Sequence, residues 1–129
     1  MKILNLTQHI ATNEQVAAGV IDLPERTRAL LQEALTFDEL PSVASLKARA
    51  DSIAIMAAGH SEGFRSAMIG GASYFMPFLE RSLWEVGIRP LYAFSRRESQ
   101  EQVLPDGSVK KVAVFRHQGF IGLEYAEPR

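Results

Sequence analysis

A chain of 129 residues, 47% of them hydrophobic, suits one ordinary domain with a single core and is too apolar for a disordered protein. Its net charge of −1 excludes a basic protein that coats duplex nucleic acid, so an anion must bind in a local pocket. There is no cysteine, which excludes disulfides and thiolate chemistry, and no apolar run reaches the roughly 18 residues of a membrane span.

The first part of the chain alternates short strands with helices. Residues 2–6 read as a strand and become polar too soon for a signal peptide, so we expect a cytoplasmic protein. Asn13 is expected to cap a short helix that ends at Gly19. Residues 20–23 form a second apolar run, typical of a strand.

Two further helices and a buried strand are expected next. Pro24 suits a helix start, and Ala29, Leu30, Ala34 and Leu35 give that helix an apolar face. Ser42 is placed to cap a third helix that runs to residue 50. The continuous apolar run at 52–58 predicts a strand covered on both faces, as in a parallel sheet.

A central helix is predicted over residues 73–86. Pro77 fits only its first turn, so the start can fall a few residues later. Gly87 ends the helix, and residues 89–95 read as the next strand. Five apolar residues recur at helical spacing and are expected to face the sheet: Phe75, Phe78, Leu79, Leu83 and Val86.

The C-terminal third predicts an antiparallel extension. Asp106-Gly107 lies between strand-like runs at 98–104 and 109–116, which is a strong hairpin signal. A last short strand is expected at 120–124, so the extension covers about residues 98–124.

These elements favour one α/β domain over residues 1–129, a three-layer Rossmann-like sandwich with a mainly parallel sheet and an antiparallel C-terminal hairpin. Ligands of such sheets bind at the carboxyl ends of the strands. Loops 7–12, 59–71 and 95–99 are expected to converge there.

The glycine pair before the central helix is the first candidate binding element. Gly70 and Gly71 let a ligand approach the backbone, and the helix start near Ser73 favours negative charge. The alternative is a tight turn that lets the helix pack on the sheet.

Two other polar clusters follow predicted strands. Thr7 and Gln8 offer hydrogen bonds to a sugar, base or phosphate, and His9 suits a general acid or base, unless it is a surface residue. Ser95, Arg96 and Arg97 follow a strand, and arginine binds phosphate bidentately. The alternative for the arginines is pairing with neighbouring glutamates.

Metal or cofactor chemistry is not expected. His9, His60 and His117 lie far apart in sequence and lack metal-type spacing. Neither serine nucleophile motifs nor a dinucleotide fingerprint is present.

Two segments together resemble the small CARF-like ring nucleases of type III CRISPR systems. They are the opening Lys2-Ile-Leu-Asn-Leu-Thr-Gln-His9 and the Gly70-Gly71 helix that leads into Arg89-Pro-Leu-Tyr-Ala-Phe-Ser-Arg96. The resemblance covers under half of the chain, and the hairpin has no counterpart in that compact family.

The resemblance implies a homodimer that binds cyclic oligoadenylate and cleaves it without metal, by attack of a ribose 2′-hydroxyl on the adjacent phosphate. Gly70-Gly71 and Arg96 would then hold phosphate, Thr7 and Gln8 would orient the ribose, and His9 would move a proton.

Three hypotheses stay open. An enzyme of this kind requires His9, Arg96 and Gly70-Gly71 in one pocket. A non-catalytic nucleotide sensor requires binding alone. A protein-interaction regulator would add its hairpin to a partner's sheet.

Overall fold

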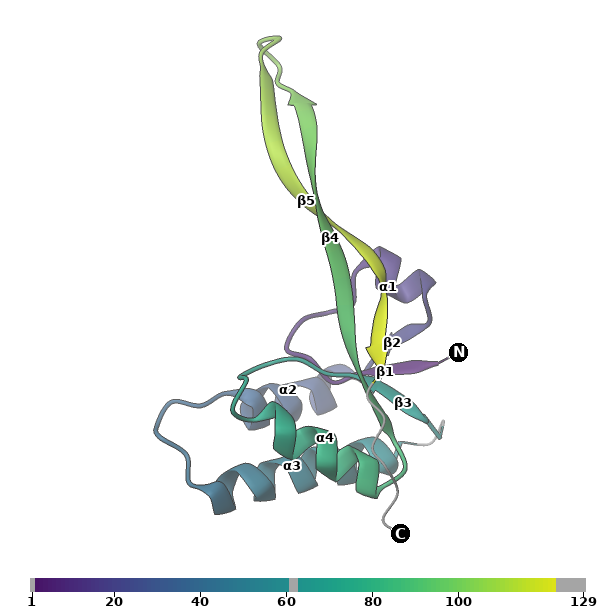
Figure 1. Cartoon of the computed structure of the whole chain (residues 1–129), viewed down its shortest axis with the longest axis vertical. Coiled ribbons are helices and arrows are strands. Elements are labelled where there is room, and N and C mark those ends of the chain that lie inside the picture. The colour runs from purple at the N-terminus through teal and green to yellow at the C-terminus, as the bar shows by residue number, and fades with distance from the viewer. Residues whose placement is uncertain (1, 61–62, 123–129) are drawn as a thin grey trace.

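The computed structural model describes residues 2–60 and 63–122, which form a sheet with helices around it (Figure 1). No described helix is long and apolar enough to cross a membrane. The elements are β1 (Ile3–Asn5), α1 (Asn13–Ala17), β2 (Val20–Asp22), α2 (Glu25–Leu35), α3 (Val43–Ala58), β3 (Ser66–Met68), α4 (Met76–Glu85), β4 (Arg89–Val103) and β5 (Val109–Gly122).

The sheet confirms the predicted α/β architecture. Its strand order is β2-β1-β3-β4-β5. The first four strands are parallel, and β5 pairs antiparallel with β4. The chain leaves β1 toward one edge and leaves β3 toward the other, so a topological switch point lies between these two strands.

The two faces of the sheet are covered unequally. Helices α2, α3 and α4 cover one face and enclose the main core, in which Leu31, Ile53, Phe75 and Leu79 are fully buried. The other face carries a smaller cluster in which Ala11, just before α1, and Phe120 of β5 pack on four buried residues: Ile3, Val20, Met68 and Leu91.

The strand predicted at 52–58 is wrong, because these residues form the second half of α3. Ser42 caps this helix as predicted, its side chain accepting a hydrogen bond from the Ser45 N–H. The apolar run is nevertheless helical, since one side of it is buried at helical spacing and Ile55 points to solvent, 68% exposed. The missing central strand is β3, within the segment predicted as a loop.

The predicted helix faces are partly wrong. In α2 the buried leucines are Leu31 and Leu35, whereas Leu30 is exposed. Helix α4 begins at Met76 with Pro77 in its first turn, later than residue 73, and Val86 beyond its end is exposed. Proline supplies no N–H, so only the first turn accommodates it.

The hairpin is confirmed, but its strands are longer than predicted. No break separates residues 95 and 98, and β5 runs unbroken to Gly122 apart from a bulge opposite Phe94 and Ser95. Figure 1 shows the outer part of β4 and β5 projecting from the body as an arm. Residues 123–124 of the predicted last strand lie outside the described residues.

The turn at the arm tip is held by Asp106. Its carboxylate accepts hydrogen bonds from the Ser108 hydroxyl at 2.6 Å and the Ser108 N–H at 2.9 Å. These two bonds, the hydroxyl first, lower the pKa of Asp106. Gly107 adopts a φ of 84°, which glycine tolerates best.

We expect Leu31→Ala to lower the free energy of unfolding by about 2 to 5 kcal/mol, because it leaves a cavity in the core. The neighbouring Leu30→Ala should change it by less than about 1 kcal/mol, since that side chain is exposed. Urea unfolding followed by circular dichroism measures both. Equal losses would contradict the observed face of α2.

Candidate functional site

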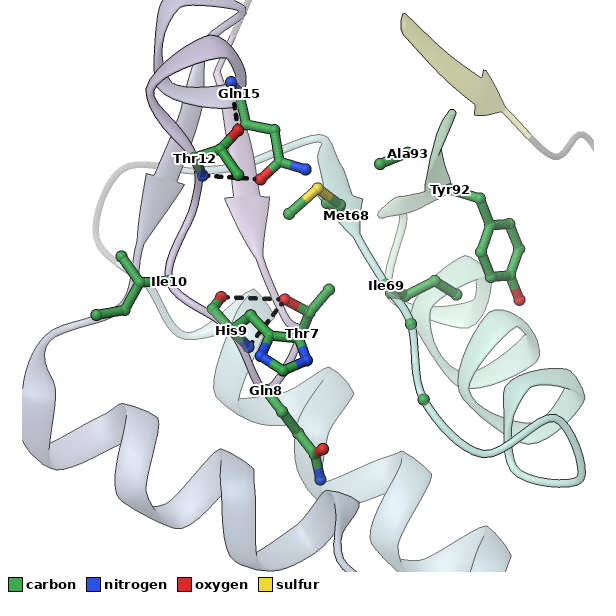
Figure 2. Close-up of a pocket in the computed structure, with 12 residues that line it drawn as sticks. Thr7, Gln8, His9, Ile10, Thr12, Gln15, Met68, Ile69, Tyr92 and Ala93 are labelled. Carbon is green, nitrogen blue, oxygen red and sulfur yellow. Dashed lines mark hydrogen bonds between the residues drawn. The ribbon is translucent and has the colours of Figure 1, made fainter. Parts of the chain in front are cut away.

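A cavity of about 520 Å³ opens at the carboxyl ends of β1 and β3, beside the switch point and next to the first part of β4 (Figure 2). The loop after β1 forms one wall, the loop after β3 forms another, and β4 contributes two residues. The lining residues are Thr7, Gln8, His9, Ile10, Thr12, Gln15, Met68, Ile69, Gly70, Gly71, Tyr92 and Ala93.

Asn5, the last residue of β1, shapes the loop after that strand. It is 3% exposed, so its amide must find partners inside the protein. Its Oδ1 accepts hydrogen bonds from the Thr7 N–H at 2.9 Å and the Thr7 hydroxyl at 2.7 Å. Its Nδ2 donates to the His9 carbonyl at 2.7 Å and to Asp22 Oδ1 at 2.8 Å. All four hydrogen-bonding positions of the amide are therefore used.

Asp22 continues this network from the neighbouring strand. It pairs in register with Asn5 across β1 and β2. Besides the Asn5 amide, its Oδ1 accepts the Ala11 N–H at 3.1 Å. The last residues of β1 and β2 thus fix the loop at two points: Asn5 at His9 and Asp22 at Ala11.

A capping box fixes the upper rim of the cavity in Figure 2. The Thr12 hydroxyl accepts the Gln15 N–H at 3.2 Å, and the Gln15 side chain accepts the Thr12 N–H at 3.0 Å. Thr12 is therefore the cap of α1, in place of the predicted Asn13.

The two glycines of the opposite wall have different roles. Gly71 has a φ of 149°, a conformation that strains any residue with a Cβ, so this position needs glycine. At Gly70 a Cβ would meet only the Thr7 methyl, at 3.6 Å. Within the described residues the N–H groups of Gly70 and Gly71 donate no hydrogen bond, which leaves them for a ligand.

The structure brings five of the predicted site residues together: Thr7, Gln8, His9, Gly70 and Gly71. The Thr7 hydroxyl donates its hydrogen to Asn5, so it can offer a ligand only acceptor capacity. The Gln8 amide lies 3.4 Å from the Thr36 hydroxyl, which turns it toward α2. The imidazole of His9 is exposed, forms no hydrogen bond with the described chain and lies beside Thr7 in Figure 2.

The other four predicted residues do not line this cavity. Ser73 lies in the turn before α4, where Phe75 is the helix cap and no side chain caps it. Ser95, Arg96 and Arg97 are exposed on β4 from the bulge outward, because that strand continues into the arm. Of the predicted loop 59–71, residues 59 and 60 precede β3 and lie away from the cavity, at the amino end of that strand.

The cavity wall is neutral. In the described part of the chain, no lysine, arginine, aspartate or glutamate lines it. The Tyr92 hydroxyl donates to Glu80 Oε2 at 2.5 Å, away from the cavity center. Among the described residues, no group of three or more histidine or acidic side chains is placed to hold a metal ion.

Sequence reasoning missed the residues that shape the site. Asn5 and Asp22 each end an otherwise apolar strand, and a polar residue at such a position is the available signal, because burial there demands hydrogen bonds. Gln15 and Thr12 carry a capping-box pattern that was also readable.

Replacing Asn5 with alanine should lower the free energy of unfolding by about 2 to 4 kcal/mol, because the partners of four hydrogen bonds then lose those bonds. It should also speed amide exchange in residues 7–11. Asn13→Ala is the matched control, since Asn13 is exposed and should change stability by under about 0.5 kcal/mol. Denaturant unfolding and hydrogen exchange distinguish the two variants.

The glycine pair should respond unequally to alanine. Gly71→Ala is expected to lower the free energy of unfolding by about 1 to 3 kcal/mol, because the φ at this position strains any other residue. Gly70→Ala should lose under about 1 kcal/mol, since nothing lies closer than 3.6 Å to the new methyl group. Thermal and chemical unfolding of both variants provide the comparison, and an equal loss would contradict this assignment.

Comparison with known proteins gives one match. No curated protein and no solved structure matches the chain. One family model, described as the Uncharacterized protein MJ1673 family, matches residues 1–121. That span includes every residue that lines the cavity and the whole projecting arm. The chain therefore belongs to the uncharacterized MJ1673 family.

Proposed function

We propose that this protein binds a nucleotide or a cyclic oligonucleotide of the oligoadenylate type in the switch-point cavity, in the cytoplasm. One observation carries the proposal. The polar loop after β1 lines one cavity at the carboxyl edge of a parallel sheet together with Gly70 and Gly71, whose N–H groups donate no hydrogen bond within the described residues. This is the usual location of ligands in such sheets.

The lining offers a group for each part of a nucleotide. The N–H groups of Gly70 and Gly71 suit phosphate oxygens, as backbone donors do in other anion sites. The carbonyl of the Gln8 side chain suits a ribose hydroxyl. Met68 and Ile69 provide the apolar surface on which a base can rest.

The size of the cavity favours one nucleotide unit at a time. About 520 Å³ falls in the range of small-molecule sites, roughly 300 to 1,000 Å³. A cyclic oligonucleotide would exceed one such cavity and would have to span two copies of the chain. A homodimer is thus part of the proposal for that ligand.

Binding without cleavage is favoured over the ring-nuclease activity. Arg96, expected to hold the phosphate during cleavage, is on the arm and not in the lining. Cleavage remains the second candidate because the free imidazole of His9 lies in the cavity wall, where it can move a proton.

Metal-stripped protein should be titrated calorimetrically with mononucleotides and cyclic oligoadenylates, with products followed by chromatography. We expect one of these ligands to bind, and Gly70→Val to weaken it at least tenfold by filling the space in front of the N–H groups. Leu30→Val, an exposed substitution on α2, is the control and should leave the affinity unchanged.

The two candidate functions predict different results in the chromatography. Intact ligand in both wild type and His9→Ala supports a sensor. Cleavage that is lost in His9→Ala and retained in His60→Ala, at the opposite edge of the sheet, supports the ring nuclease. If no ligand in the panel binds, the proposal fails.

A further inference from the structure

The arm, residues 95–117 of β4 and β5, exposes apolar side chains that no other described part of the chain covers. Val103 is 73% exposed, Val109 57% and Phe115 68%. The register pairs Val103 with Val109 and Arg97 with Phe115, so strand alternation puts these side chains on one face. An isolated two-stranded hairpin is marginally stable in water, so a covered arm is the expected functional state.

The accessible surface is large for the mass. The chain exposes 8745 Å². A compact monomer of 14.3 kDa exposes about 6,800 Å². The arm contributes to this difference because both of its faces are open, and specific interfaces bury surface of the same order, roughly 1,200 to 2,000 Å².

The arm and the rest of the chain carry opposite net charge. Three acidic and five basic residues lie within 95–117, a net charge of +2. The whole chain carries −1, so the remainder carries −3. Lys110 and Lys111 give the arm tip its basic character, and neither forms an ion pair within the described chain.

A complementary surface lies at the connection between α2 and α3. Leu40 is 98% exposed there, beside a cavity of about 440 Å³ lined by Phe37, Leu40, Pro41, Leu46 and Tyr74 together with the acidic Asp38 and Glu39. We call this the acidic groove.

The acidic groove is preformed. Arg49 donates to the Thr36 carbonyl at 2.6 Å and lies over the Phe37 ring, 4.4 Å from its centroid. Phe37 in turn meets the Tyr74 ring edge to face at 5.4 Å. A partner would therefore meet an ordered surface, at a lower entropic cost.

We propose that the arm of one copy packs in the acidic groove of a second copy, with the face that carries Val103, Val109 and Phe115 against Leu40 and Tyr74. Lys111 lies on that same face and is directed at Asp38 and Glu39, whereas Lys110 lies on the opposite face and adds positive charge at the rim of the contact. In Figure 1 the arm tip and the connection between α2 and α3 lie at opposite ends of the molecule. A two-fold axis between inverted copies makes both contacts at once, which closes the assembly as a dimer.

The reach of the arm agrees with this arrangement. Residues 95–103 of β4 span roughly 30 Å at 3.3 Å per residue. A compact domain of this length has a radius of gyration of about 14 Å, so the arm extends across most of a neighbouring copy.

Sedimentation velocity across a concentration series tests the proposal. Wild type should be a dimer. The double variants Lys110→Glu/Lys111→Glu and Asp38→Lys/Glu39→Lys should each raise the dimer dissociation constant at least tenfold. The control is Arg26→Glu/Lys47→Glu, which changes the charge by the same amount at exposed positions of α2 and α3. It should leave the dimer dissociation constant unchanged.

Mixing the two variants provides the decisive measurement. In the mixed pair, the acidic arm meets the basic groove and the native arm meets the native groove, so an equimolar mixture should dimerise like wild type. Phe115→Ser and Leu40→Ser should weaken the dimer, whereas Leu30→Ser should not.

Three results would overturn the proposal. The first is a wild-type monomer at all concentrations. The second is a dimer that survives both charge reversals, or a mixture that stays monomeric. The third is a monomer that co-sediments with added duplex DNA through Lys110 and Lys111, which would assign the arm to nucleic acid.

Discussion

The buried amide of Asn5 determines the shape of the site. An apolar residue at this position would remove the hydrogen bonds that hold the loop at Thr7 and His9. Asn5 instead uses both of its donors and both of its acceptor positions on Thr7, His9 and Asp22. An ordered loop matters for recognition, because a ligand then does not have to supply the entropy of ordering it.

The strand order explains why this loop faces the glycine pair. Strands β1 and β3 are neighbours, yet they lie more than sixty residues apart in sequence. The chain leaves them in opposite directions, which opens a crevice between their carboxyl ends. Strand β4 does not end at that edge. It passes the crevice and continues into the arm, which is why Arg96 and Arg97 lie outside the cavity.

Sequence reasoning recovered the elements with clear local signals. The first two strands, the Ser42 cap and the Asp106-Gly107 turn follow from local chemistry, and the convergence of residues 7–9 with Gly70 and Gly71 follows from the fold class. It failed where tertiary contacts determine the secondary structure. An alanine-rich apolar run such as 52–58 is compatible with strand and helix, and in the fold it is a helix that packs against α4 and α2. The short β3 gives no periodic signal, since three residues complete less than two alternations.

The strand order also has a consequence for folding during synthesis. Strands β1 and β2 are made first and pair with each other, and each later strand then joins the same open edge of the growing sheet: β3 on β1, β4 on β3, β5 on β4. The sheet can therefore grow outward in the order in which the ribosome releases the chain, and no strand has to be inserted between two that have already paired. The last addition is a hairpin with a short turn, the kind of local closure that forms within microseconds.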